Sequence, residues 1–264
     1  MHIGTVIGDL RNGPLGERFE VLPELGVRSV EVWLGEGPLD GDFLEAVRKK
    51  AEAAGVGFWS VHASFAIDPS SPDISVRRRA VEDIVRCAKG IVRLGGKVVV
   101  FHASQEVEDG ERSERIALAL ESIREAAEGA FREGAVLALE NEPLGHLGDS
   151  EEELSHLLDP FPPEVLGLCW DTGHAHIAGE GEKLLRKLGD RLVTVHIHDN
   201  DGTKDEHLLP GYGTIDWASY MAELDRCGYE GPLMFEAGGP GGYEEVFRAL
   251  SRVGGHLLEL MGRA

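Results

Sequence analysis

Short apolar segments alternate with amphipathic segments along the chain. Eight apolar segments have the length and residue types of strands, and we expect strands near residues 2–7, 28–33, 57–62, 97–102, 135–140, 165–170, 191–198 and 232–236. Helical spacing of apolar residues predicts helices near 15–25, 41–54, 73–94, 112–133, 150–158, 181–188, 216–227 and 243–261. The strands are nearly continuous apolar runs, as in a sheet buried on both faces. The pattern therefore predicts an α/β protein of eight strand–helix units.

Six consecutive predicted strands, the third to the eighth, end in a residue that can bind a metal ion. They read VGFWSVH, KVVVFH, AVLALE, VLGLCWD, LVTVH and PLMFE, and their last residues are His62, His102, Glu140, Asp171, His196 and Glu236. Imidazole and carboxylate groups are ligands that zinc, manganese and related divalent ions select. In parallel strands these side chains would meet at one end of the sheet.

Unbroken strand–helix alternation predicts a parallel sheet, which is either open or closed. An open sheet gathers its ligand-binding residues at one switch point. Here the candidate ligands come from six successive strands, which favours a closed ring in which every strand end faces one mouth. The chain has 264 residues, close to the roughly 250 of such a barrel. We therefore predict a single-domain (β/α)8 TIM barrel over residues 1–264.

The net charge indicates which partners the protein is expected to bind, and the cysteine content indicates its cellular compartment. Lys and Arg number 26 and Asp and Glu number 47, so the formal charge is −21. An acidic surface opposes loose attraction to nucleic acid and to anionic membranes, although it does not exclude a local basic groove. Three cysteines without a spaced framework, and a start (Met1-His2-Ile3-Gly4) without a signal pattern, predict a cytoplasmic protein. Apolar stretches are too short to span a bilayer.

Two loops add further candidate ligands just beyond strands that already end in one. After the sixth strand the chain reads Asp171-Thr172-Gly173-His174, and a turn there would bring His174 to the pocket. After the seventh strand it reads Asp205-Glu206-His207. Residues two apart in an extended loop point the same way, so Asp205 and His207 are expected to bind one ion together.

These segments resemble a known superfamily along the whole chain. The most specific pieces are VHASF, VVVFHAS, LALENEP, CWDTGHAHIAGE, HIHDNDGTKDEHLLPGYGTIDW and LMFEAGG. They are similar to the xylose-isomerase-like TIM barrels, which include sugar isomerases, epimerases and endonuclease IV. The resemblance to endonuclease IV implies three zinc ions, which are held by His62, His102 and Glu140; by Glu140, Asp171, His196 and Glu236; and by His174, Asp205 and His207. The simpler epimerases imply one divalent ion at the second of these sets.

The chain departs from both patterns at particular positions. Ala103-Ser104 follow His102 where endonuclease IV has Pro-Gly, and Glu206 stands where that family has a basic residue. The chain has no evident Arg-and-aromatic insertion of the kind that wedges into a duplex. Epimerases usually carry an Arg shortly after the histidine of the seventh strand, whereas Lys204 is the only cation in that loop here.

The resemblance implies an enzyme that isomerises or epimerises a small sugar, polyol or keto compound. Glu140 and Glu236 are the expected proton-transfer residues, and His198, Trp33 and Lys204 are expected near the substrate. The glycine-rich run 238–242 is either a phosphate-binding loop or a turn. Two alternatives stay open, a three-metal phosphodiesterase of the endonuclease IV type acting on abasic DNA and a metal-binding protein without activity. The metal (zinc or manganese), the number of ions (one to three) and a possible homo-oligomer are not decided by the residues.

Overall fold

A closed ring of parallel strands forms the centre of the molecule. The computed structural model describes residues 1–11, 15–238 and 242–263. Neighbouring strands pair in parallel in the order β7-β6-β5-β4-β3-β2-β1-β8, and a single parallel bridge between Ile197 and Phe235 brings the two edge strands together. The strands are β1 Ile3–Asp9, β2 Val27–Trp33, β3 Gly57–His62, β4 Val98–Phe101, β5 Val136–Glu140, β6 Leu166–Asp171, β7 Leu192–His196 and β8 Leu233–Phe235. The predicted TIM barrel is therefore confirmed.

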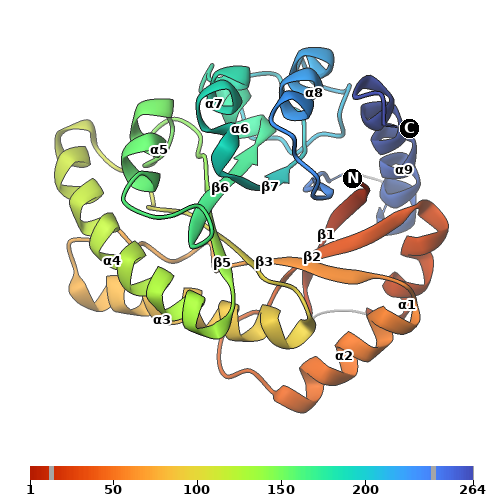
Figure 1. The fold of residues 1–264 in the computed structure, drawn as a ribbon, viewed down its shortest axis with the longest axis horizontal. Helices are drawn as coiled ribbons and strands as arrows, with labels where there is room; N and C mark the ends of the chain where they lie inside the picture. The colour runs from red at the N-terminus through yellow and green to blue at the C-terminus, as the bar shows by residue number, and fades with distance from the viewer. Residues whose placement is uncertain (12–14, 239–241, 264) are drawn as a thin grey trace.

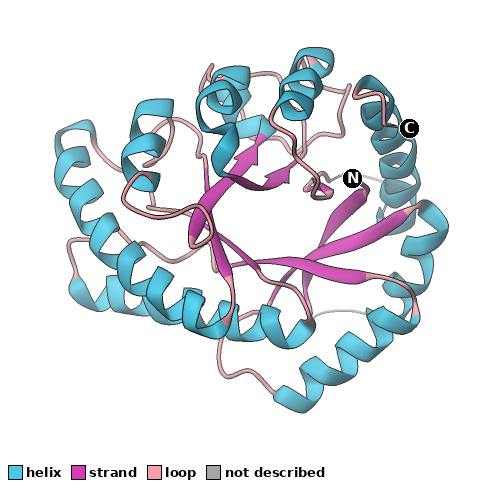
Figure 2. Cartoon of the chain, viewed as in Figure 1, coloured by secondary structure: helices cyan, strands magenta, loops and turns pink. Residues whose placement is uncertain are grey.

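Helices surround the strands on the outside of the ring (Figures 1 and 2). Within the described residues these are α1 Leu15–Val21, α2 Gly41–Ala53, α3 Ile74–Leu94, α4 Arg112–Glu133, α5 Glu151–Leu158, α6 Thr172–Ile177, α7 Gly181–Leu188, α8 Trp217–Arg226 and α9 Gly242–Leu260. Short 3-10 helices lie at η1 Leu22–Leu25, η2 Asp109–Glu111 and η3 Gly189–Arg191. The longest helices, α3 and α4, lie side by side against the outer face of the sheet (Figure 1).

Local chemistry sets several of the helix starts. The carboxylates of Asp40, Asp73 and Asp216, and the hydroxyl of Ser150, accept hydrogen bonds from the first free backbone N–H groups of α2, α3, α8 and α5. The expected helix 15–25 was too long, because α1 ends at Val21 and Pro23 lies in the following 3-10 turn, where its ring cannot continue an α-helix.

The alternation of side chains along each strand separates two packed layers. Val99 and Phe101 of β4 face outward into the large core between sheet and helices, whereas Val98 and Val100 belong to a small inner cluster with Ala138 and Cys169. The inner register continues into the residues that follow, so His102, two positions after Val100, points to the inside. The same period of two places the polar ends of the other strands inside the mouth of the barrel.

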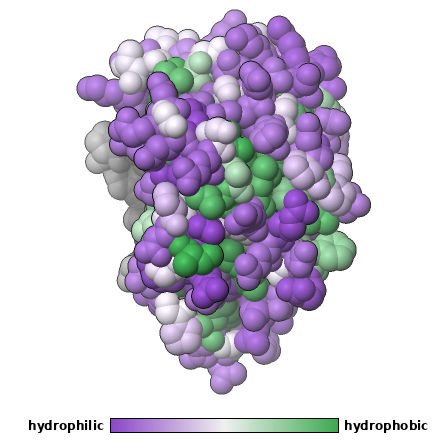
Figure 3. Space-filling model, turned by 90° about the vertical axis from the view of Figure 1, so that its left-hand side faces the viewer, coloured by the Kyte–Doolittle hydropathy of each residue, from purple (hydrophilic) through white to green (hydrophobic). Residues whose placement is uncertain are grey.

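One outer face of the barrel is mainly polar, in agreement with the excess of acidic residues. The face beside α3, α4 and α5 is mainly hydrophilic and carries only limited hydrophobic patches (Figure 3). Among the described helices, none combines the length and the apolar character that crossing a membrane requires.

Candidate metal centre

The six predicted strand-end ligands lie at the carboxyl ends of neighbouring strands. His62, Glu140, Asp171 and His196 are the last residues of β3, β5, β6 and β7. His102 and Glu236 directly follow β4 and β8. Because these strands are parallel, all six side chains enter the same mouth of the barrel, which is the end where TIM barrels carry their active sites.

The central group contains Glu140, Asp171, His196 and Glu236, whose candidate ligand atoms all lie within 4.8 Å of one another. Nδ1 of His196 is 3.0 Å from Oε1 of Glu140, 3.0 Å from Oε2 of Glu236 and 3.9 Å from Oδ2 of Asp171. Burial raises the pKa of Glu140, but His196 and hydrogen bonds from the neighbouring histidines outweigh it and hold this pKa well below 4.5. Glu140 is therefore a carboxylate at neutral pH.

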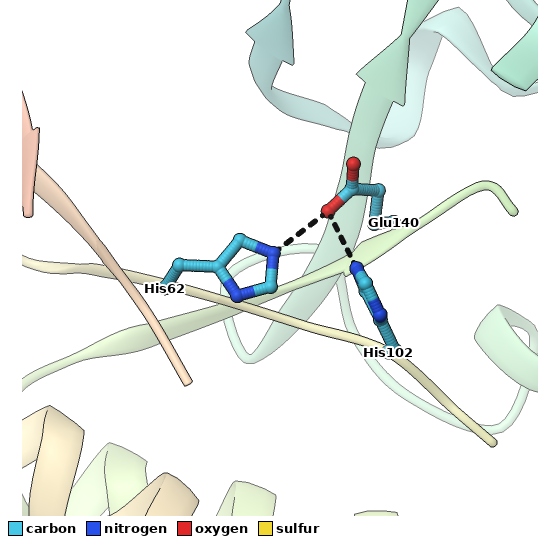
Figure 4. A group of neighbouring side chains, drawn as sticks. All are labelled: His62, His102 and Glu140. Carbon is cyan, nitrogen blue, oxygen red and sulfur yellow. Dashed lines mark hydrogen bonds and ion pairs between the residues drawn. The ribbon is translucent and has the colours of Figure 1, made fainter. Parts of the chain in front are cut away.

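A second group shares Glu140 from the other side. Nε2 of His62 lies 3.0 Å from Oε2 of Glu140, and Nε2 of His102 lies 3.2 Å from the same oxygen (Figure 4). The two imidazoles approach from β3 and from the end of β4, with their ring centroids 4.9 Å apart. Glu140 thus presents one oxygen to this group and the other to His196.

The third group lies on helix α6, directly after β6, and on the loop after β7. Oδ2 of Asp205 is 3.4 Å from Nε2 of His174 and 3.0 Å from Nε2 of His207, so the structure brings these three predicted ligands into contact. The ring of His198 stacks on that of His207 at 4.1 Å. Nε2 of His198 lies 3.0 Å from Oδ2 of Asp171, which also places it beside the central group.

The segment after β6 is not the turn that the sequence suggested. Residues Thr172–Ile177 form the short helix α6, and Oδ1 of Asp171 accepts a hydrogen bond of 2.7 Å from the backbone N–H of His174. Asp171 therefore uses one oxygen to cap the helix and turns the other toward His196 and His198. This cap fixes the direction in which His174 leaves the strand.

In each of the five predicted histidine ligands, one ring nitrogen faces the candidate metal group. The other nitrogen lies within hydrogen-bond distance of a backbone oxygen or of an acid outside the predicted ligand set. The pairs are His62 Nδ1 with Ala63 O at 2.7 Å, His174 Nδ1 with Asn141 O at 3.0 Å, His207 Nδ1 with Glu236 O at 2.7 Å, His102 Nδ1 with Glu142 Oε1 at 3.0 Å, and His196 Nε2 with Glu31 Oε1 at 3.1 Å. An imidazole that donates one N–H in this way presents a bare nitrogen at the other side. This is the usual arrangement around metal-binding histidines.

The charge balance of the central group also fits a divalent cation. Three carboxylates surround a single imidazole, so the group stays negative even when His196 is protonated. Asp171, His196 and Glu140 are almost completely buried, where an uncompensated negative charge is costly. Oxygen and nitrogen donors of this kind suit zinc, manganese and similar ions.

A cavity of about 620 Å³ opens above these groups. Trp33 and Phe65 form one wall with their rings edge to face at 5.2 Å, and Glu140 and Glu236 lie at the bottom. Among the described residues that line the cavity, none is Lys or Arg. Lys204, expected near the substrate, is exposed on its loop and outside the lining.

Two acids at this mouth were not among the predicted site residues. Glu31 lies in the middle of β2, and Glu142 follows Glu140 by two residues on the same side. Glu31 carried a signal in the sequence, since an acid between Val30 and Val32 in a predicted buried strand requires a partner. His198 is completely buried against Asp171 and is not part of the cavity lining.

The fold is a TIM barrel, and the mouth of the barrel holds carboxylates and imidazoles of the kinds that can bind a metal ion. A family model described as xylose isomerase-like TIM barrel matches residues 19–253. The chain therefore belongs to this family.

Curated relatives include proteins of two kinds. An uncharacterized protein of Methanocaldococcus jannaschii is 34% identical over 184 residues, which are 67% of this chain and 63% of that protein. A second uncharacterized protein, of Sinorhizobium fredii, is 39% identical over 83 residues, only 27% of its length. The probable endonuclease 4 of Thermoplasma acidophilum is 25% identical over 265 residues, covering 94% of this chain and 92% of the relative.

Solved structures with the same fold include sugar epimerases. The structure of a D-tagatose 3-epimerase-like protein has a TM-score of 0.84 at 27% identity and covers 99% of this chain and 97% of its own. L-ribulose 3-epimerase has a TM-score of 0.83 at 20% identity, with 99% and 96% of the two chains covered. At this lower identity the second comparison shows the fold alone.

Proposed function

We propose that this protein is a divalent-metal-dependent epimerase or isomerase of a small sugar, polyol or related keto compound. The observation that carries the proposal is the buried group of Glu140, Asp171, His196 and Glu236 beneath the cavity. These four residues would hold the ion. A bound divalent ion supplies Lewis acidity that polarises a substrate carbonyl.

Glu140 and Glu236 are proposed to transfer the proton. They come from β5 and from the end of β8, and their candidate ligand oxygens lie within 4.8 Å of each other. Burial raises the pKa of Glu236, but the opposite effect of His196 is larger, and the net result is a pKa of about 2. Both side chains reach the cavity as carboxylates, so one accepts a proton from a substrate carbon. The other first takes a proton from solvent and then delivers it to that carbon, and the first releases its proton to solvent afterwards.

The cavity walls favour an uncharged, polyhydroxylated substrate. Trp33 and Phe65 offer apolar ring surface, and Ser104, Gln105 and His146 offer hydrogen-bonding groups around it. Sugar sites commonly combine these two kinds of contact. Because the described lining contains no Lys or Arg, a phosphorylated substrate would find no ammonium or guanidinium group there. The likeness to a D-tagatose 3-epimerase-like protein supports the same substrate class.

Solvent proton exchange tests this function directly. The manganese-loaded protein is incubated with a panel of ketoses in deuterated water, and deuterium incorporation and new epimers are measured by NMR. We expect incorporation into at least one ketose, and a loss of about 100-fold or more in Glu236→Gln, since general acid–base groups contribute roughly 10²–10⁴-fold. Glu206→Gln is the matched control, because Glu206 is exposed and outside the cavity lining. Metal-loaded protein that exchanges no ketose contradicts the proposal.

A second candidate is a phosphodiesterase of the endonuclease 4 type. The specific observation in its favour is the presence of the two additional groups, around His62 and His102 and around Asp205. Zinc-loaded protein that nicks a duplex containing an abasic site, and exchanges no ketose, would support this function. Bound metal without activity in both assays would support a metal-binding protein without catalysis.

A further inference from the structure

Glu31 is a buried acid within the barrel that neither proposed activity uses. It lies on β2 between Val30 and Val32, and its side chain is completely inaccessible. Trp33, two residues later on the same strand, lines the cavity, whereas Glu31 does not. Glu31 therefore lies deeper in the barrel than the cavity and has no route to a substrate.

The contacts of Glu31 converge on one imidazole. Its Oε1 lies 3.1 Å and its Oε2 lies 3.2 Å from Nε2 of His196. The hydroxyl of Ser60, on the neighbouring strand β3, donates a hydrogen bond of 2.6 Å to Oε2. His196 is also fully buried and meets Glu140 and Glu236 through its other nitrogen. His196 is thus held between an acid below and the proposed metal ligands above.

The two nitrogens of a neutral imidazole are not equivalent, because one carries the proton and the other has the free lone pair. A metal ion at Nδ1 requires the tautomer with its proton on Nε2. A carboxylate accepts hydrogen bonds and, when ionised, donates none. An ionised Glu31 next to Nε2 therefore selects the tautomer whose lone pair faces Glu140, Asp171 and Glu236.

We propose that Glu31 is a positioning residue that fixes the tautomer and orientation of His196 so that Nδ1 is available to the metal. The inference rests on the proposed metal site, but not on the reaction carried out there. Ser60 supports it by holding the carboxylate in place. Carboxylates in this position behind metal-binding histidines typically change metal affinity by 10- to 100-fold.

Glu31→Gln is the informative variant, since it keeps the size and shape of the side chain. Either orientation of the amide puts an NH2 group where an oxygen now lies 3.1 or 3.2 Å from Nε2. The NH2 group can donate to an unprotonated Nε2, whereas the amide oxygen can still accept from Nε2–H, so the variant no longer excludes the tautomer with its proton on Nδ1. The same exchange of acid for amide produces the wrong histidine tautomer in a serine protease triad.

The experiment measures the tautomer of His196 and the metal affinity of the protein, in the wild type and in variants of its neighbours, without any substrate. Long-range 15N–1H NMR of the metal-free protein, at a pH where His196 is neutral, reports which nitrogen of His196 carries the proton, and competition with a fluorescent chelator reports zinc affinity. We expect a proton on Nε2 in the metal-free wild type, and in Glu31→Gln a metal affinity about 10- to 100-fold weaker together with a measurable population that carries the proton on Nδ1.

Two matched variants separate positioning from a general loss of structure. Glu142→Gln makes the same change beside His102 and is expected to leave the tautomer of His196 unchanged. Ser60→Ala removes one hydrogen bond but keeps the carboxylate, and it is expected to keep the proton on Nε2. Wild-type protein with Nε2 unprotonated overturns the inference without requiring any variant to fold, and so does a Glu31→Gln protein with unchanged zinc affinity.

The outcome is distinguishable from failure of the proposed function. Wild-type protein that binds zinc but exchanges no ketose contradicts the epimerase proposal and leaves the Glu31 result meaningful. A protein that exchanges ketoses, with Glu31→Gln binding metal as tightly as the wild type, contradicts the role of Glu31 alone.

Discussion

Gly173 shows how one absent side chain sets the spacing of the site. A Cβ atom at this position would lie 2.0 Å from Cε1 and 2.5 Å from Nδ1 of His198. The ring of His198 therefore occupies the space next to the first turn of α6 and reaches Asp171 from there. The sequence around Gly173 does not indicate this packing, because the contact joins residues that are 25 positions apart.

Gly173→Ala is expected to destabilise the protein although alanine favours helices. The added methyl overlaps His198, and overpacking of this kind typically costs about 1–3 kcal/mol. We expect a lower free energy of unfolding in urea together with weaker metal binding, since His198 must move away from Asp171. Gly255→Ala in α9 is the matched control, because a Cβ there meets no atom within 4 Å. Equal stability of the two variants would show that His198 moves at no cost.

The site residues could be predicted where strand periodicity determines them. The alternation of side chains places the ends of β3 to β8 inside the mouth, and the six strand-end residues follow from that pattern. The inward direction of Glu31 follows from the same alternation, but its partner His196 lies 165 residues away. Such a pairing depends on how the sheet closes, which local patterns do not contain.

At the scale of elements, the connection between β7 and α8 is organised by one buried carboxylate. Asp199 accepts hydrogen bonds from the backbone N–H groups of Asn200 and Gly211 at 2.9 and 2.8 Å, and from the indole of Trp217 at 3.0 Å. The loop between these anchors carries Asp205 and His207. The sequence pointed to Asp205 and His207 as candidate ligands, but it did not show which residue holds their loop in place.

Asp199→Asn is expected to loosen this loop. Every acceptor position of Asp199 faces an N–H donor, so the amide NH2 leaves at least one buried donor without a partner, at a cost of about 1–3 kcal/mol. We expect faster proteolysis within residues 200–216 and altered Trp217 fluorescence. Asp201→Asn, at an exposed position two residues away, should behave like the wild type. Unchanged proteolysis in Asp199→Asn would contradict the anchoring role.

At the scale of the whole molecule, the acidic charge and the buried mouth make stability depend on pH when metal is absent. Burial lowers the pKa of His102, but the opposite effect of Glu142 and Glu140 is larger, and the net result is a pKa of about 10. Burial also lowers the pKa of His207, but Asp205 and Glu236 raise it by more, to about 9. Both values lie above the ordinary 6.5, so the protonated histidines stabilise the folded state below pH 6.5, and this contribution is lost as the pH rises through 9 to 10.

We therefore expect the melting temperature of the metal-free protein to fall between pH 6.5 and pH 10. Divalent metal ions compete with these protons for the same nitrogens, so the metal-loaded protein should lose less stability over that range. Thermal unfolding with a chelator, and in parallel with added manganese, measures the difference. A metal-free melting temperature that stays constant or rises over this range contradicts the assignment of these histidine–acid pairs.

The central claim is that imidazoles and carboxylates from separate strand–helix units bind a divalent cation at the mouth of the barrel. Elemental analysis of freshly purified protein, followed by calorimetric titration of metal-free protein with zinc and manganese, tests it most directly. The account predicts at least one tightly bound ion per chain, and loss of that binding in His196→Ala. Protein that contains no divalent metal and takes up none on titration would contradict it.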